Sequence, residues 1–425
     1  MHSYFCGATM KKRSGKECLM KRISFIHAAD LHLDSPMVGL KYLPQDIFTR
    51  VKESTFTALK KVTEAAIHHQ VDFVVLAGDL FDGEDRSLRA QSRFRTEMLK
   101  LAENKIHVYV IHGNHDHLNG SWVHLNMPVN VHVFNSKVET KVLHTKNGEI
   151  VHLYGFSYPT RHVYDRKIDE YRKKDGADFH IGILHGNESG RVDHDNYAPF
   201  SVSDLHKKEF DYWALGHIHK RAVLSESPPI IYPGNIQGRN KKETGMKGIY
   251  HVTLTELDKK INFLETADII WEETVVDAAS AKNVHDVLQL CQTTINSFRR
   301  EQKGTLLSLS LKNIVLADER EQRSLKGELL ELLLENEKEE ESFVWIVDLT
   351  VIEGQLIDKE QLKRDANFYA ELFETIENYA DVDLALSPLY EHQLGRKYIS
   401  QLSTADQEEL INKAENLLLE LLYQS

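Results

Sequence analysis

The stretch "IHVYVIHGNHDH" (residues 106–117) joins an apolar run directly to a polar cluster. The six residues after Ile111 hold three histidines, an asparagine and an aspartate. The apolar part has the β-branched and aromatic composition of a buried strand. In α/β sheets, ligand sites lie beyond the carboxyl ends of the strands. The stretch therefore predicts an α/β fold with functional side chains at one edge of a sheet.

The segments around this strand alternate between strand and helix patterns. Before residue 130 the order is strand, helix, strand, helix, strand, over residues 22–30, 47–69, 72–78, 87–104 and 106–113. This order predicts parallel strands with right-handed crossovers. After residue 130 the apolar runs are shorter and closer together, which predicts a second, mixed or antiparallel sheet.

Composition is that of a globular protein with two or three domains. The chain has 425 residues, of which 41% are hydrophobic and 27% charged. No apolar run approaches the length of a membrane span. The three cysteines lack the spacing of a disulfide framework or a thiolate zinc site, so we expect a cytoplasmic protein. Residues 1–19 are basic but have no apolar core, so we expect a disordered extension rather than a secretory signal.

Charge and histidine content mark a boundary near residue 270. Through Ile270 there are 37 Lys+Arg against 33 Asp+Glu, whereas the remaining 155 residues have a net charge of −16. Before residue 271 lie 21 of the 23 histidines. From about residue 268 a strand and helix alternation predicts a small α/β unit to residue 355. The chain beyond it is helical, and its last segment carries an apolar stripe from Leu410 to Leu422.

Four further polar clusters follow predicted strands. They contribute Asp30 and His32, Asp79 and Asp82, His185, and His217 and His219. Any one of them alone would be a weak signal, but the ordered series is strong. Carboxylate, carboxamide and imidazole ligands together suit Mn²⁺, Fe²⁺ or Zn²⁺. The candidates exceed what one ion needs, and a shared carboxylate would allow two ions about 3.5–4 Å apart.

This series (D-x-H, G-D-x-x-D, G-N-H-D, H, G-H-x-H) resembles the calcineurin-like metallophosphoesterase superfamily. Within it, the chain is similar to the SbcD-type DNA repair nucleases, particularly a bacterial YhaO-like branch. The stretches that carry the resemblance are "HAADLHLDSP", "GDLFD", "HGNHD", "LHGN", "GHIHKR" and "YPGNIQGRNKKETGMKG". The resemblance implies a four-layer αββα core over residues 20–267, an α/β capping domain over 268–355 and a helical segment over 356–425.

The resemblance also implies roles for individual residues. The metal ligands would be Asp30, His32 and His219 for one ion, Asn114, His185 and His217 for the other, and Asp79 as the bridge between them. His115 would stabilise the pentavalent phosphate or protonate the leaving oxygen. Asp116 would orient His115. Asp82 stands where some relatives have histidine, so we expect it to support a ligand or cap a turn.

The implied activity is metal-dependent hydrolysis of DNA phosphodiester bonds by an exo- or endonuclease. Two divalent ions would serve as cofactors, Mn²⁺ being favoured over Fe²⁺ or Zn²⁺. Basic residues after the GHIH motif would grip phosphates, although each could equally be a solvated surface charge; they are Lys220, Arg221, Arg239, Lys241, Lys242 and Lys247. The implied partners are DNA and an SbcC-like ABC-type ATPase with a long coiled coil, docked on the terminal helices. A homodimer is a further expectation.

Two other functions compete with this one. The same metals would serve a small-molecule phosphodiesterase or phosphatase, although such an enzyme needs no added domains. The fold could also be a non-catalytic scaffold for an ATPase, which the intact ligand set disfavours. The apolar stripe from Leu410 to Leu422 could pack inside the protein instead of binding a partner.

Overall fold

The structure is a computed structural model. It describes residues 20–37, 39–83, 87–120, 123, 125–189, 197–314, 328–335, 337, 341–353, 367–377, 379, 381–392, 402 and 404–423. The expected extension over residues 1–19 lies outside this range. The chain divides into two compact units, the first comprising Met1–Leu311 with Leu316–Val351 and the second Lys312–Val315 with Ile352–Ser425. None of the described helices is long and apolar enough to cross a membrane.

The first sheet carries the predicted parallel strands. Its order is β12-β11-β1-β2-β3-β4, and its strands are β1 (Arg22–Ala28), β2 (Phe73–Ala77), β3 (His107–Ile111), β4 (Val131–Val133), β11 (Gly248–Thr255) and β12 (Lys259–Glu265). β1 to β3 run parallel, as predicted, β4 extends this parallel set, and β11 pairs antiparallel with β1. The prediction that all strands after residue 130 form the second sheet is wrong for β4, β11 and β12. Strand periodicity does not specify the neighbour with which a strand pairs.

The second sheet has the predicted mixed character. Its order is β5-β6-β7-β8-β10-β9, and its strands are β5 (Glu139–His144), β6 (Ile150–Gly155), β7 (Phe179–His185), β8 (Tyr212–Gly216), β9 (Ala222–Glu226) and β10 (Pro229–Tyr232). The central strands are parallel, whereas β5 and β9 join the edges antiparallel. β5 and β9 were not predicted, because their mixed polar composition lacks a clear apolar run.

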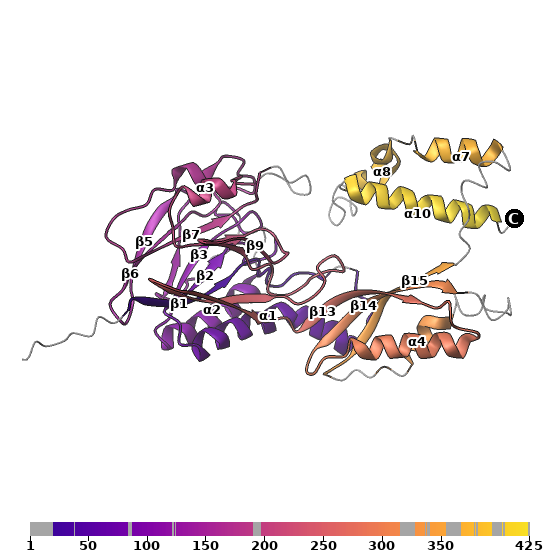
Figure 1. Cartoon of the computed structure of the whole chain (residues 1–425), viewed down its shortest axis with the longest axis horizontal. Helices are drawn as coiled ribbons and strands as arrows, with labels where there is room; N and C mark the ends of the chain where they lie inside the picture. The colour runs from indigo at the N-terminus through magenta and orange to yellow at the C-terminus, as the bar shows by residue number, and fades with distance from the viewer. Residues whose placement is uncertain are drawn as a thin grey trace, which may run out of the picture. The chain divides into compact units, whose positions relative to one another are not determined.

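Two helices cover the outer face of the first sheet (Figure 1). α1 (Gln45–His68) buries the apolar side of its surface, including Ile47, Leu59 and Val62. α2 (Leu88–Glu103) begins at Ser87, whose hydroxyl accepts a hydrogen bond from the Ala90 N–H at 2.9 Å and so caps the helix. Both helices pack on the sheet through one apolar cluster.

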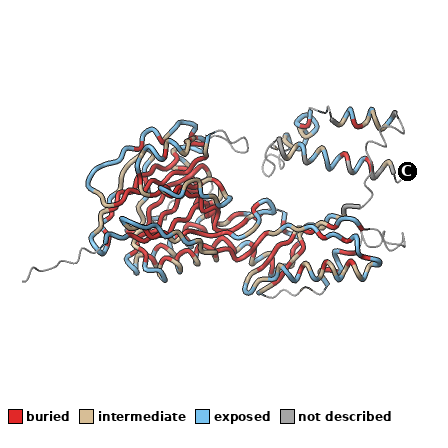
Figure 2. Tube along the Cα trace, in the orientation of Figure 1, coloured by how far each residue is buried: buried red, intermediate tan, exposed pale blue. Residues whose placement is uncertain are grey.

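The two sheets face each other across a second apolar cluster, which includes Phe25 and Phe73 from one sheet and Ile181 from the other. Burial is concentrated in these strands (Figure 2). The far face of the second sheet is covered by η1 (Lys167–Glu170), α3 (Val202–His206) and their loops. This arrangement confirms the predicted α/β fold, although the fourth layer is made mostly of loops. It also brings the carboxyl ends of β1, β2, β3, β7 and β8 to a shared edge.

A three-stranded sheet follows, in the order β13-β14-β15. It comprises β13 (Ile269–Asp277), β14 (Gly304–Ile314) and β15 (Val344–Glu353), with α4 (Val284–Ser297) between the first two strands. Its apolar face packs on the start of α1 and the loop before it. Arg50 of α1 also donates to both carboxylate oxygens of Asp268, at 2.9 and 3.1 Å. The sheet is therefore anchored to the first layer of the molecule.

In the described residues, the second unit consists mainly of helices. They are α7 (Asn367–Glu377), α8 (Val382–Glu391) and α10 (Thr404–Tyr423). A groove of about 280 Å³ lies among these helices. Leu410, Ile411 and Leu418, which belong to the predicted apolar stripe, line it together with Val382 and Leu386 of α8. At least part of the stripe therefore faces the neighbouring helices of its own unit.

Candidate metal centre

Four of the predicted ligands follow strands at positions where the backbone takes a left-handed conformation. φ is 52° at Asp30, 42° at His32, 52° at Asp79 and 101° at His217. Such angles are uncommon for residues other than glycine, and in native structures they gather at functional sites. The loops after β1 and β2 run side by side, with the Asp30 N–H donating to the Gly78 carbonyl at 3.0 Å. The backbone of these loops therefore fixes where the side chains point.

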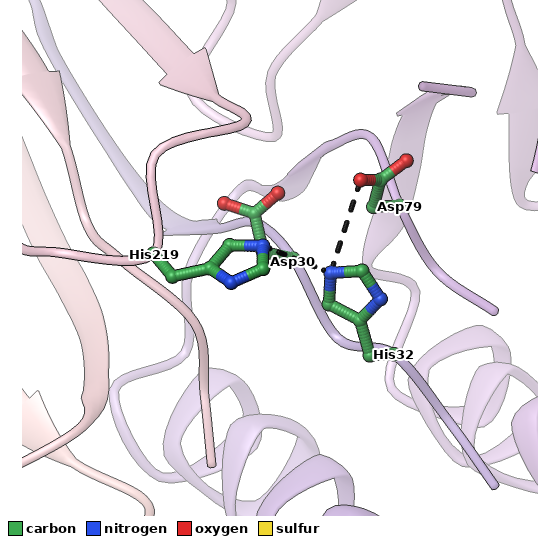
Figure 3. Close-up of side chains that lie close together, drawn as sticks. All are labelled: Asp30, His32, Asp79 and His219. Carbon is green, nitrogen blue, oxygen red and sulfur yellow. Dashed lines mark hydrogen bonds and ion pairs between the residues drawn. The ribbon is translucent and has the colours of Figure 1, made fainter. Parts of the chain in front are cut away.

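Four of the predicted ligands converge on one point. Asp30, His32, Asp79 and His219 each offer a ligand atom within 4.8 Å of the others (Figure 3). The Nε2 atoms of His32 and His219 face each other at 3.0 Å. These residues come from the carboxyl ends of β1, β2 and β8, so three strands build one cluster.

A carboxylate lies near the other nitrogen of each imidazole, within hydrogen-bonding distance at His219 and farther away at His32. His219 Nδ1 lies 2.8 Å from a Glu243 oxygen, and His32 Nδ1 lies 3.4 Å from Asp82. A carboxylate at Nδ1 favours the tautomer with hydrogen on Nδ1, which leaves the Nε2 lone pair for a metal. Both Nε2 lone pairs then point at the same place, and this is stable only with a proton or a cation between them. The donor set therefore fits a divalent cation.

A second group of ligands lies beside the first and shares Asp79 with it. His185 Nε2 lies 3.1 Å from the Asn114 side-chain oxygen and 3.4 Å from Asp79. His185 Nδ1 donates to the Ala77 carbonyl at 2.9 Å, so its Nε2 is again the nitrogen left for a metal. The His217 ring lies 5.2 Å from the His185 ring, between centroids. Asp79, Asn114 and His185 thus form a second group, and the His217 ring meets His185 edge to face beside it.

Burial and neighbouring charges shift the pKa values of the side chains in this cluster. Burial lowers the pKa of His32 to about 3, and Arg239 adds to the effect, so the ring is neutral. Burial opposes the charged form of His185, but Asp79 and Asp30 outweigh it and raise its pKa to about 9. Burial raises the pKa of Asp30. A cation that binds here must therefore displace protons.

Glycine at position 113 leaves the space that the metal ligands need. A Cβ atom there would lie 2.3 Å from Oδ1 of Asp79 and 2.6 Å from Nε2 of His185. Gly78 is similarly close to His185, with 2.3 Å from its ideal Cβ to Nδ1. Both contacts are too short for any side chain. Gly113 therefore permits close approach of the loop after β3 to Asp79 and His185.

The His115 side chain lies at the open side of the cluster. It is 32% exposed, and its Nδ1 lies 3.5 Å from Asp82. Asp116 was expected to orient His115, but the carboxylate that faces this ring is Asp82. The Asp116 oxygens accept hydrogen bonds from the N–H groups of Leu80 and Gly113 at 2.9 and 2.7 Å, and from Nδ1 of His112 at 2.8 Å. Asp116 therefore holds the loop together. The hydrogen bond to Asp116 also gives a structural role to His112, for which the sequence predicted none.

Glu243 is the residue of this centre that the sequence did not reveal. Besides His219, it accepts hydrogen bonds from the side chains of Asn235 and Arg239 at 2.7 and 3.1 Å. Burial opposes its ionisation, but the hydrogen bond from His219 and the charge of Arg239 outweigh it and lower its pKa far below the usual range. It lies 24 residues after His219, in a basic segment, so no local pattern points to it.

The basic residues predicted to grip DNA fall into two kinds. Arg239 is only 15% exposed and lies between Asp82 and Glu243. Lys247 is buried and donates to the His219 carbonyl at 3.2 Å. These two support the ligands from inside, which differs from the surface position expected of them. The others are exposed, namely Lys220, Arg221, Lys241 and Lys242. Among them, Lys241 forms an ion pair with Asp348 of β15 at 3.1 Å.

Comparison with known proteins agrees with this geometry. The model of the family described as "Calcineurin-like phosphoesterase" matches residues 23–221, which include every proposed ligand. The uncharacterized metallophosphoesterase YhaO of Bacillus subtilis is 42% identical over 405 residues, covering 94% of this chain and 98% of that protein. The chain belongs to the calcineurin-like phosphoesterase family. As a calcineurin-like phosphoesterase it is a hydrolase of phosphoester bonds.

Other relatives of this calcineurin-like phosphoesterase are named as DNA repair proteins. The DNA double-strand break repair protein Mre11 of Thermoplasma acidophilum is 26% identical over 230 residues, covering 51% of this chain and 57% of that protein. The protein of the same name from Methanocaldococcus jannaschii is 27% identical over 270 residues, covering 59% and 68%. A solved structure of a dimetal phosphatase from Danio rerio is 13% identical with a TM-score of 0.33, covering 58% of this chain and 98% of that chain. This last likeness is too weak to add to the assignment.

Proposed function

We propose that this phosphoesterase is a metal-dependent DNA phosphodiesterase that uses two divalent cations. The observation that carries the proposal is the pair of ligand groups joined by Asp79, in which carboxylates and a backbone carbonyl orient the imidazoles. The similarity to two proteins named for DNA double-strand break repair supports DNA as the substrate.

The ligands divide between two cations. One would be held by Asp30, His32 and His219, and the other by Asn114, His185 and His217, with Asp79 common to both. When bound, divalent cations supply Lewis-acid polarisation of a phosphate and activation of water. The mixture of carboxylate, amide and imidazole favours Mn²⁺, with Fe²⁺ and Zn²⁺ as alternatives.

His115 is the proposed acid of the reaction. Its ring stands beside the cluster, exposed enough to meet a substrate, and its backbone N–H donates to Asp79 at 2.9 Å. Asp82, 3.5 Å from His115 Nδ1, orients the ring so that Nε2 can hold a proton for the leaving oxygen. Because Asp82 also lies 3.4 Å from His32 Nδ1, one carboxylate positions both the acid and a ligand.

The exposed basic side chains that follow His219 provide a place for the nucleic acid backbone. Lys220, Arg221 and Lys242 lie on the surface after β8 and in the segment that carries Glu243. Such contacts attract phosphates without reading sequence. We therefore expect DNA binding that weakens with salt and shows little sequence preference.

The test compares substrates under defined metals. The purified chain should cleave a DNA duplex or single strand in Mn²⁺ and lose this activity in a chelator, and Asn114→Ala should be inactive while keeping its fold by circular dichroism. Cleavage of bis-p-nitrophenyl phosphate without any cleavage of DNA would favour a small-molecule phosphodiesterase. Hydrolysis of neither, with metal bound, would favour the scaffold role.

We also propose that the helices of residues 356–425 bind a coiled-coil ATPase. The groove among α7, α8 and α10 supports this, as do Leu410, Leu417 and Leu418 of α10, which remain 38, 56 and 42% exposed. Removal of residues 356–425 should leave hydrolysis of small phosphodiesters unchanged, because every proposed ligand lies before residue 220, and should abolish pull-down of a co-expressed SbcC-like ATPase. Unchanged pull-down with a lowered melting temperature would mean that the helices serve only the protein's own stability.

A further inference from the structure

We propose that His162, Tyr164 and Tyr197 form a stacking platform for an unpaired nucleobase beside the metal centre. The inference rests on the proposed function, because it assumes a substrate with bases attached to the phosphate that is cleaved. It deepens that function by specifying the form of the substrate, which is single-stranded or frayed at the cleaved nucleotide.

The three rings lie nearly parallel to one another. The ring of His162 is 5.9 Å from Tyr164 at an interplanar angle of 13° and 5.7 Å from Tyr197 at 22°, measured between centroids. The two tyrosine rings are 5.8 Å apart at 12°. Because all three spacings are alike, the rings form an offset group with a common orientation, and not a linear stack. Offset parallel arrangements are also the ones that aromatic rings prefer with further rings.

The group is joined directly to the metal centre. The Tyr197 ring meets the ring of the proposed ligand His217 edge to face, with 5.4 Å between centroids. The loop after β6 and the loop after β7 are tied by a hydrogen bond from the Ala198 N–H to the Val163 carbonyl at 2.7 Å. The Tyr197 hydroxyl and His162 Nδ1 are 2.8 Å apart. The platform is therefore built onto the residue that would hold one of the cations.

The three rings differ in how far they are exposed to solvent, and only the exposed ones can contact a ligand. Tyr197 is 7% exposed and Val163 is buried, so these two residues brace the loops. Tyr164 is 62% exposed, and His162 is also exposed. A ring that is held parallel to its neighbours yet left largely in solvent adds little to the core. It does present a flat apolar face to a substrate.

A nucleobase is the ligand chemistry that fits such a face. Stacking of a base on an aromatic side chain tolerates any base, because every base has a π face. In a duplex both faces of an internal base are already stacked on neighbours, so only an unpaired or frayed base can use the platform. The inference thus predicts a preference for single strands and overhangs over blunt, paired ends.

The experiment compares two chromogenic esters that differ only in the base-bearing group. These are the p-nitrophenyl ester of thymidine 5′-monophosphate and methyl p-nitrophenyl phosphate, assayed with Mn²⁺. The ratio of their kcat/KM values should fall about tenfold in Tyr164→Ala, within the range found when base stacking is removed. Tyr164→Phe, which keeps the ring, should retain the wild-type ratio. Tyr42→Ala removes another exposed tyrosine, one that is 60% exposed, and serves as the control.

A binding measurement independent of catalysis accompanies this assay. In chelator, 2-aminopurine in a single-stranded overhang should lose fluorescence on binding to the wild type and to Tyr164→Phe, and lose much less with Tyr164→Ala. An unchanged ester ratio together with unchanged quenching in Tyr164→Ala would overturn the platform. If the wild type cleaves the nucleotide ester but no DNA, the proposed DNA function fails. The ratio then still decides whether a base of a free nucleotide uses the platform.

Discussion

Replacing Glu243 with glutamine should weaken metal binding although Glu243 is not itself a proposed ligand. One oxygen of Glu243 accepts from His219 Nδ1 at 2.8 Å and from Arg239 at 3.1 Å. The other accepts from the Asn235 amide at 2.7 Å and from the Arg239 backbone N–H at 2.8 Å. A glutamine has one acceptor oxygen, so its amide nitrogen must face one of these two pairs of donors.

One orientation of the glutamine amide lowers folding stability, and the other lowers metal affinity. Facing Asn235, the amide nitrogen leaves two donors unsatisfied at a buried position, which costs about 2–6 kcal/mol of folding stability at roughly 1–3 kcal/mol per lost partner. Facing His219, it favours the tautomer with hydrogen on Nε2, so that nitrogen can no longer bind the cation. Loss of a residue that orients a ligand in this way typically costs 10–100-fold in metal affinity. We expect Glu243→Gln to lose affinity within that range.

Competition with a fluorescent chelator measures this affinity, and urea unfolding in chelator measures stability separately. Glu256→Gln provides the control, because Glu256 is exposed and its ion pair with Lys21 is long, at 3.7 Å. Wild-type Mn²⁺ affinity in Glu243→Gln would refute the argument that this carboxylate sets the His219 tautomer. A loss of stability alone would show that Glu243 serves only to bind Arg239 and Asn235.

Four further predictions concern the centre itself. His115→Ala should slow cleavage by roughly 10²–10⁴, the usual contribution of a positioned general acid, with metal content unchanged; a parallel loss of metal would make it a ligand. Gly113→Ala should lower the metal content measured by atomic absorption, since its Cβ would meet Asp79 and His185, and full occupancy would contradict this reading of the glycine. Because the pKa of His185 is raised to about 9, Mn²⁺ affinity should rise with pH up to about 9 in titrations, and a flat profile would oppose it. The same raised pKa stabilises the metal-free fold below pH about 6.5, and urea unfolding should show this contribution lost as pH rises through about 9.

Local sequence patterns were sufficient for the parallel strands and for the positions of the candidate ligands. Asp30, Asp79 and His185 each end or follow an apolar run, and parallel strands deliver such residues to one edge whatever their separation along the chain. The sheet to which each strand belongs was harder to predict from the sequence. β11 pairs with β1 across more than 220 residues, and its composition would suit either sheet.

The residues that support the ligands were harder to predict, for a physical reason. A metal ligand must stand at a strand end, whereas the group that holds its other nitrogen can approach from any direction. Asp82 lies three residues after Asp79 and could be found locally, but Glu243 could not. Its segment is fixed from the three-stranded sheet, since Trp271 of β13 donates from Nε1 to the Gly238 carbonyl at 3.1 Å and accepts from the Gly245 N–H at 2.8 Å. The orientation of His219 therefore depends, through Glu243, on contacts made by a part of the chain that contains no proposed ligand.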